Sequence, residues 1–356
     1  MKYRLILLII IINYFKLFSL SPKLEMRGVD ISYLAQQKDC EIQFYKNGKT
    51  TPILQILNEA GVNWIRLRLW HTPAENWNNL EYTLKTAQEI KAAGFNFLLD
   101  IHYSDTWADP NNQKVPKAWE KLNFAELCSA VEEYTFDVLK KFNEANCLPD
   151  MIQIGNEITN GMLWQHGKLS DKQGIKNFTV LLKKASLIIR KNFPEMKIML
   201  HIDRGDNGTL STWFFNIIKN NNIDYDIIGL SYYSYWNGKN LQNVGKNIRD
   251  LKKRFSKDVC IVETSYMWTL NWKDNCNNIA GTKAQLIDKY PATPEGQKNY
   301  LHDICDITYL SGGCGIFWWE PTAVASKNFS SSLENTAWFD FDNNYNNTGN
   351  VFLNFK

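Results

Sequence analysis

The sequence predicts a single α/β domain that folds as a (β/α)8 TIM barrel. Eight short apolar segments with the length of strands alternate with helix-like stretches along the chain. This alternation is typical of parallel strands, either in an open doubly wound sheet or in a closed barrel, and the count of eight favours the barrel. The 356 residues exceed the roughly 250 of a minimal barrel by room for loops and a leader, and no shift in composition divides them into two domains.

The predicted strands and helices follow one another in a regular order. We expect the eight strands over residues 27–30, 62–69, 95–101, 151–154, 198–202, 227–232, 259–262 and 315–318. We expect the helices over about 52–60, 80–93, 124–146, 172–191, 241–255 and 294–310. Gly61 and Gly94 follow two of these helices directly, and glycine is a common residue at that position.

The composition excludes some classes of partner. A formal charge of +3, from 40 basic and 37 acidic residues, gives no field that would attract nucleic acid or an anionic membrane. No predicted strand is followed by Gly-x-Gly-x-x-Gly or by a phosphate loop, which argues against dinucleotide binding. The 13 Trp, 16 Tyr and 19 Phe supply aromatic faces that suit sugar rings, although we expect most of them in the core.

Residues 1–21 have the pattern of a signal peptide. A charged start is followed by residues 5–12, which are all apolar. Asn13 and Lys16 interrupt the apolar run, so it is shorter than the roughly 20 residues of a membrane span. Because the cleavage site is poorly formed, an uncleaved anchor is the alternative. We expect an exported protein, secreted, periplasmic or at the cell surface, in which residues 22–356 form the barrel without membrane contact.

The cysteines show no metal-binding pattern. Their odd number leaves at least one unpaired, and both one or two disulfides and buried free thiols fit the sequence. Their positions are Cys40, Cys128, Cys147, Cys260, Cys276, Cys305 and Cys314. We expect no metal and no cofactor.

Two predicted strands end on a glutamate. Glu157 follows the fourth strand after Gly155 and Asn156, and Glu263 directly follows the seventh. The C-terminal ends of barrel strands form one rim, where active sites lie. The ends of the fourth and seventh strands face each other across this rim. A carboxylic acid and a carboxylate nucleophile about 5 to 5.5 Å apart are what a retaining glycoside hydrolase requires. The pair therefore predicts glycoside chemistry.

Neighbouring residues fit the same chemistry. Arg66 and Arg68 alternate with apolar residues on the second strand, so both should point into the barrel. A fixed positive charge there would keep a nearby carboxylate ionised, so we expect a raised pKa for Glu157 and a normal or lowered pKa for Glu263. Asn156 precedes the expected acid and could bind the sugar 2-hydroxyl.

Other residues at strand ends complete a predicted sugar-binding rim. The polar candidates are His102, Asp105, His201, Asp203, Tyr232 and Tyr233. The candidates for stacking on pyranose rings are Trp107, Trp236, Trp318 and Trp319. Trp119 and Trp338 are expected in the core.

Several runs of residues resemble a known family of enzymes. They are Arg27-Gly28-Val29-Asp30, residues 61–70, residues 102–110, Ile154-Gly155-Asn156-Glu157-Ile158, His201-Ile202-Asp203, Trp319-Glu320-Pro321 and the C-terminal residues 337–341 and 350–352. In this order they resemble the endo-β-1,4-galactanases of glycoside hydrolase family 53. The run around Trp107 discriminates best, because Asn-Glu occurs across the whole clan of related barrels.

The resemblance implies an endo-acting enzyme that cleaves β-1,4-galactan of type I arabinogalactan and pectin side chains with retention of configuration. It implies that Glu157 is the acid/base and Glu263 the nucleophile. It also implies that Arg66, Asn156 and Tyr233 serve subsite −1, and that Trp107 and Trp319 line the cleft. A polysaccharide substrate and a monomeric protein are expected.

The sequence departs from the family at two places. Ser234 stands where proline is common, and the loop after Pro321 continues differently. Some bacterial members bind calcium in the loop after the seventh strand; here that loop has Asp274 and three asparagines but only one carboxylate, which favours a hydrated loop.

Two other functions fit part of the sequence. A mannanase or cellulase of the same clan would keep the catalytic pair but lack the match over residues 104–110. A carbohydrate-binding protein without catalysis would need no carboxylate pair.

Overall fold

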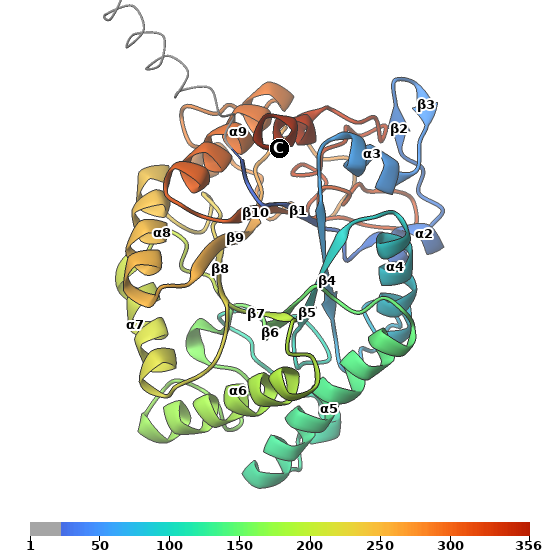
Figure 1. Ribbon diagram of the computed structural model, residues 1–356. Helices are drawn as coiled ribbons and strands as arrows, with labels where there is room; N and C mark the ends of the chain where they lie inside the picture. The colour runs from blue at the N-terminus through green and yellow to red at the C-terminus, as the bar shows by residue number, and fades with distance from the viewer. Residues whose placement is uncertain (1–22) are drawn as a thin grey trace, which may run out of the picture.

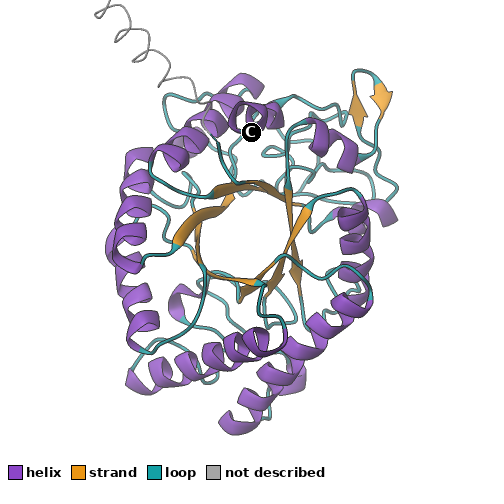
Figure 2. Cartoon of the chain, viewed as in Figure 1, coloured by secondary structure: helices purple, strands orange, loops and turns teal. Residues whose placement is uncertain are grey.

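The chain folds as a closed barrel of eight parallel strands inside a ring of helices (Figures 1 and 2). This computed structural model describes residues 23–356, so the predicted signal peptide lies outside the described residues. Around the barrel the order is β1-β10-β9-β8-β7-β6-β5-β4, and β1 pairs with β4 to close it. The predicted single (β/α)8 barrel is confirmed.

The eight barrel strands lie within a few residues of the predicted positions. They are β1 (Met26–Asp30), β4 (Trp64–Leu69), β5 (Asn96–Ile101), β6 (Met151–Ile154), β7 (Lys197–Ile202), β8 (Ile227–Ser231), β9 (Asp258–Thr264) and β10 (Gly315–Trp319). Between β1 and β4 the chain also forms a small hairpin, β2 (Tyr45–Lys46) and β3 (Lys49–Thr50), that the sequence did not predict.

The helices connect successive strands around the outside of the barrel. They are α2 (Leu34–Asp39), α3 (Ile53–Glu59), α4 (Leu80–Ala92), α5 (Phe124–Glu144), α6 (Lys172–Asn192), α7 (Gly208–Asn220), α8 (Leu241–Phe255) and α9 (Pro294–Leu310). After β10, a 3-10 helix over Thr348–Phe355 packs beside α9 in place of an α-helix after the last strand.

Helix α7 was not predicted, although the sequence carries its signals. The Asn207 side chain caps its start by accepting a hydrogen bond from the backbone N–H of Leu210. Ser211, Phe214, Phe215 and Ile218 have helical spacing and are buried.

The barrel interior has an apolar floor and a polar upper layer. Because side chains alternate along a strand, Ile65, Leu67 and Leu69 of β4 pack outward against the helices, and Arg66 and Arg68 point inward as predicted. The floor consists of Met26, Leu98, Met151, Met199, Ile227, Cys260, Val262, Cys314 and Phe317. Position 28 requires glycine, because a Cβ there would lie 2.1 Å from the Phe317 ring.

Several predictions about single residues can now be resolved. All seven cysteines are free thiols. Trp119 and Trp338 are buried as expected. Trp318 was expected to present a face to a sugar, but it is completely buried and packs against Trp338 and Tyr300. Successive side chains of β10 point to opposite faces. Trp319 points into the barrel mouth, so Trp318 points outward to the helices.

Within residues 23–356, none of the helices has the length and apolar character that crossing a membrane requires.

Replacing the buried Trp318 with alanine should destabilise the protein strongly. A buried tryptophan truncated to alanine costs about 3–5 kcal/mol, which should lower the melting temperature by several degrees. Trp213→Ala is the matched control, since Trp213 is 42% exposed and should change stability by less than about 0.5 kcal/mol. Equal melting temperatures for the two variants would contradict the assigned burial.

Candidate active site

Glu157 reaches the barrel mouth through a strained turn after β6. Gly155 has φ +77°, and a Cβ at that position would lie 2.6 Å from the Ile158 side chain, so glycine is required there. Glu157 itself has φ 45° and ψ 49°, a left-handed conformation that is uncommon for residues other than glycine. Such strain persists where the surrounding structure enforces it, and it is concentrated at functional sites.

Glu263 reaches the same space through an irregularity in β9. Val262 belongs to the apolar floor, so strict alternation would turn Glu263 outward. The pairing register with β8 shifts between Leu230 and Ser231, where Ser231 pairs with Glu263. An irregularity of this kind can re-aim a side chain, and here Glu263 faces the interior beside Val262.

The two glutamates lie close to each other. One carboxylate oxygen of Glu157, one of Glu263 and one ring nitrogen of His201 are all within 4.8 Å of one another. Retaining glycosidases hold their carboxyl groups about 5–5.5 Å apart, whereas inverting ones hold them about 6.5–9.5 Å apart. The separation fits the retaining geometry.

Arg66 lies at the centre of the polar layer. Its Nη1 is 2.8 Å from Asp30 Oδ2 and 2.8 Å from Glu263 Oε1, and its Nη2 is 2.8 Å from Asp100 Oδ2. Nη2 also donates to Asn156 Oδ1 at 2.9 Å. One buried guanidinium thus fixes residues from β1, β4, β5, β6 and β9. The surrounding carboxylates raise its pKa despite burial, so it stays charged.

The hydroxyl of Tyr233 holds the other oxygen of Glu263. It donates to Glu263 Oε2 at 2.8 Å, and Ser231 Oγ donates to the same atom at 3.3 Å. Burial and the Glu263 charge raise the pKa of Tyr233 well above its ordinary value, so the phenol stays a donor. Both oxygens of Glu263 are therefore fixed.

Burial raises the pKa of both glutamates, but Arg66 and the Tyr233 hydroxyl oppose this effect only at Glu263. Burial and the charges of Glu263 and Asp203 raise the pKa of Glu157 well above its ordinary value, as expected. Burial also raises the pKa of Glu263, although Arg66 and the Tyr233 hydroxyl act in the opposite direction. The expectation of a normal or lowered pKa for Glu263 was wrong because the effect of burial outweighs Arg66 and the Tyr233 hydroxyl, and the charges of Asp30 and Asp100 raise the pKa further.

Two buried histidines also take part in this hydrogen-bond network. His102 Nδ1 accepts hydrogen bonds from Trp70 Nε1 and from the backbone N–H of Ala108, so its proton is on Nε2, which donates to Asp100 at 3.0 Å. Burial and Arg66 lower the pKa of His201 well below its ordinary value, which keeps the ring neutral.

The nitrogens of His201 are not free to bind a metal. Because Ser231 Oγ donates to Glu263, Nε2 donates to Ser231 Oγ at 2.7 Å. Nδ1 then accepts from Gln153 Nε2 at 3.2 Å and from the backbone N–H of Glu157 at 3.4 Å. The ring therefore orients Ser231 and Gln153, and the cluster with Glu157 and Glu263 is better suited to proton transfer than to holding an ion.

A cavity of about 250 Å³ contains most of the predicted residues. Those lining it are Arg66, Arg68, His102, Trp107, Asn156, Glu157, Tyr233, Trp236, Glu263 and Trp319. Trp107 and Trp319 meet edge to face, with ring centroids 6.1 Å apart, and form one wall.

Four of the predicted polar residues lie elsewhere. Tyr232 is buried, and its hydroxyl donates to the carbonyl of Gly238 at 2.7 Å. His201 is fully buried beneath Asn156 and does not line the cavity. Asp105 accepts hydrogen bonds from the backbone N–H groups of Thr72 and Lys117, so it holds loops together outside the cavity. Asp203 lines an adjoining cavity of about 520 Å³ that also contains Glu157.

Sequence reasoning did not select Asp30, Asp100 and Glu320, although all three lie at strand ends. Asp30 and Asp100 contact Arg66, and Glu320 pairs with Arg68 at 3.0 Å. The alternation that placed Arg66 inside the barrel also applies to Asp100 on the neighbouring strand, so the signal was present. The Arg68 guanidinium lies 4.1 Å from the Trp107 ring centroid and 4.4 Å from that of Tyr33, and supports this wall.

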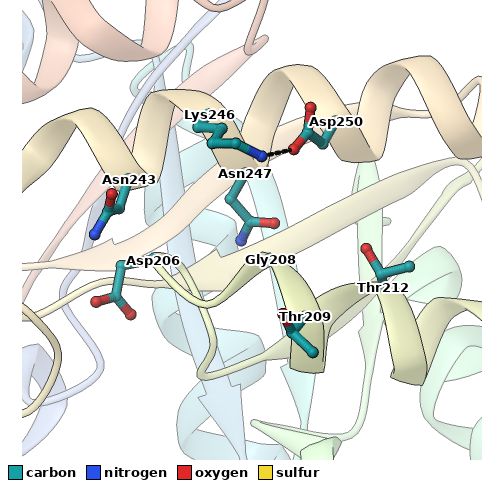
Figure 3. Close-up of a pocket in the computed structure, with 8 residues that line it drawn as sticks. All are labelled: Asp206, Gly208, Thr209, Thr212, Asn243, Lys246, Asn247 and Asp250. Atoms are coloured by element: carbon teal, nitrogen blue, oxygen red, sulfur yellow. Dashed lines mark hydrogen bonds and ion pairs between the residues drawn. The ribbon is translucent and has the colours of Figure 1, made fainter.

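A separate hollow of about 460 Å³ lies between α7 and α8 (Figure 3). Its lining is polar: Asp206, Gly208, Thr209, Thr212, Asn243, Lys246, Asn247 and Asp250. Lys246 is paired with Asp250, and the Asn247 amide donates to backbone carbonyls. It contains none of the predicted site residues, so the candidate active site is the barrel mouth.

Comparison with known proteins identifies the family of the chain. A family model described as glycosyl hydrolase family 53 matches residues 26–352. The chain belongs to this family.

Family 53 relatives are similar over nearly their whole length. The arabinogalactan endo-beta-1,4-galactanase of Cellvibrio japonicus is 35% identical over 344 residues, covering 92% of this chain and 90% of the relative. The GH53 catalytic domain of Ignisphaera aggregans superposes with a TM-score of 0.88 at 35% identity, covering 94% and 97% of the two chains. A structure of fungal beta-1,4-galactanases has a TM-score of 0.81 at 30% identity, covering 93% and 99%.

The activity of this family 53 protein should have a bell-shaped pH dependence. In kcat/KM we expect the acidic limb to report ionisation of Glu263 and the basic limb to report loss of the Glu157 proton. Because both pKa values are raised, both limbs should lie above the ordinary glutamate pKa of about 4.3.

Glu157→Gln should remove the basic limb. The measurement compares wild type and variant on one aryl glycoside whose leaving group is less basic than a sugar hydroxyl but is still assisted by the acid. The wild type then shows the basic limb and the variant keeps measurable activity. A basic limb that survives unchanged in this variant would show that another group is the acid.

Proposed function

We propose that the protein is an endo-acting retaining glycosidase that cleaves β-1,4-galactan of type I arabinogalactan by double displacement. The observation that carries this proposal is the pair Glu157 and Glu263, whose carboxylate oxygens approach within 4.8 Å in a cavity walled by tryptophans. Membership of family 53 and the galactanase names of its relatives supply the substrate.

In the first step Glu157 is the acid and Glu263 the nucleophile. Glu157 gives its proton to the glycosidic oxygen while a Glu263 oxygen attacks the anomeric carbon. The bond to the leaving chain breaks, and an ester between the galactosyl unit and Glu263 forms. Arg66 and Tyr233 hold the attacking carboxylate in one orientation, so little reorganisation is needed.

In the second step Glu157 is the base. Its carboxylate takes a proton from water, and the hydroxide oxygen attacks the anomeric carbon and releases Glu263. Its raised pKa suits both roles, because Glu157 is protonated before the first step and can be protonated again in the second.

The remaining predicted residues have distinct proposed roles. Asn156 is held between Arg66 and the carbonyl of Ala108, a position that supports contact with the sugar 2-hydroxyl. Trp107 and Trp319 are proposed to stack on sugar rings. His102, His201 and Asp105 position other groups through hydrogen bonds.

Location and assembly belong to the same proposal. Galactan is a polysaccharide of the cell exterior, so the chain is proposed to be exported with residues 1–21 as a cleaved signal and to act as a monomer. N-terminal sequencing of the exported protein tests this, and a chain that still begins at Met1 would indicate the anchor.

Reducing-sugar release from potato galactan, mannan and carboxymethylcellulose tests the substrate. Galactan should be cleaved and the other two should not. Preferential cleavage of mannan or carboxymethylcellulose would indicate another clan member, and binding of galactan without any cleavage would indicate a carbohydrate-binding protein.

Glu263→Ala should abolish galactan hydrolysis, and azide should restore activity on an activated aryl galactoside. Removing the carboxylate opens space for a small anion, which attacks the anomeric carbon once and yields a glycosyl azide of inverted configuration. The product is analysed by NMR. Glu157→Ala is the control and should yield a retained glycosyl azide; the reverse stereochemistry would exchange the two roles.

A further inference from the structure

Two cavities meet at Glu157. The 250 Å³ cavity and the 520 Å³ cavity share Asp109, Glu157, Tyr233 and Trp236. Glu263 and Arg66 line the first but not the second. The expected acid therefore faces both cavities, and the expected nucleophile faces one.

This asymmetry gives the polysaccharide a direction across the site. The nucleophile bonds to the anomeric carbon, so the donor sugar must occupy the cavity that contains Glu263. The acid protonates the oxygen that leaves with the other part of the chain. The cavity reached by Glu157 without Glu263 is then the place for the leaving part.

Arg204 and Trp236 give this second cavity the means to hold a sugar. Arg204 follows β7, and its Nη1 is paired with Asp203 Oδ2 at 2.8 Å. Its backbone carbonyl accepts hydrogen bonds from Ser211 Oγ and Asn247 Nδ2, which fix the loop. Its Nε is buried and has no hydrogen-bond partner among the described residues.

The Trp236 ring is 59% exposed but held in place. It meets Tyr233 and Tyr235 edge to face, at centroid distances of 5.1 and 5.0 Å. An exposed ring on a fixed support, beside a guanidinium and a carboxylate, is complementary to a pyranose: the ring stacks and the charged pair binds hydroxyls.

We propose that Arg204 and Trp236 bind the first galactosyl unit of the leaving chain, with the Arg204 guanidinium and Asp203 bonded to its hydroxyls. This inference rests on the proposed galactan cleavage and adds which side of the cleft binds the leaving part and through which residues. Arg204 is a binding residue and takes no part in bond making.

The test compares substrates with and without a sugar on the leaving side. Galactan has one, whereas 4-nitrophenyl β-1,4-galactobioside has only the aryl group there. In Arg204→Ala the ratio of kcat/KM for galactan to that for the aryl substrate should fall about tenfold, the value of one hydrogen bond to a charged group. In Trp236→Ala the ratio should also fall, because the stacking surface for the leaving sugar is lost. Arg204→Lys should recover part of the loss.

Arg254→Ala is the matched control. Arg254 lies on α8, contacts Asn216 and lines neither cavity, so the ratio should stay at the wild-type value. An Arg204→Ala ratio equal to that of this control would overturn the proposal.

A second measurement separates binding from an indirect effect on Glu157. Galactobiose, added as an acceptor during aryl-substrate turnover, should form transfer product with a half-saturating concentration about tenfold higher in Arg204→Ala. The basic limb of the galactan pH profile should not move. A shifted basic limb with unchanged acceptor saturation would overturn the proposal, because Arg204 would then act through the acid. Wild-type enzyme that cleaves neither substrate would overturn the proposed function itself.

Discussion

The site depends on one buried positive charge. Arg66 is 1% exposed and contacts Asp30, Asp100 and Glu263, each at 2.8 Å. A guanidinium in this position is tolerated only because the carboxylates offset its desolvation, and removing one partner of such a cluster typically costs about 3–5 kcal/mol. The same contacts join β1, β4, β5 and β9, so the requirement to neutralise one charge also fixes the positions of the reacting groups.

The two glutamates proposed to be catalytic differ because Arg66 contacts only one of them. Glu263 has a guanidinium on one oxygen and the Tyr233 hydroxyl on the other, which oppose the effect of burial on its pKa. Glu157 has negative neighbours, Glu263 and Asp203, which add to the effect of burial. Two identical side chains therefore titrate in the order that an acid and a nucleophile require. The strained φ of Glu157 indicates that the surrounding turn enforces its position.

The sequence predicted the barrel well because its strands are buried and apolar and end on polar residues, and these local patterns have one packing solution. It predicted that Glu157 and Glu263 lie at the barrel mouth because both are close to strand ends, and that Arg66 points into the barrel because it alternates with apolar residues. It did not predict the register shift that turns Glu263 inward, since pairing register depends on the neighbouring strand.

Roles that depend on three-dimensional contacts were also beyond the sequence. His201 and Asp105 have the residue types of sugar ligands, but their hydrogen bonds go to the protein. Trp318 is on the face of β10 that packs against the helices, and Trp319 is on the opposite face; helix packing determines which face is buried.

The most direct measurement is to trap the galactosyl-enzyme with an activated 2-deoxy-2-fluoro-galactoside and to map the labelled peptide by mass spectrometry. The label should be on Glu263, and a label on Glu157 or on any other residue would contradict the assignment of the nucleophile that Arg66 holds.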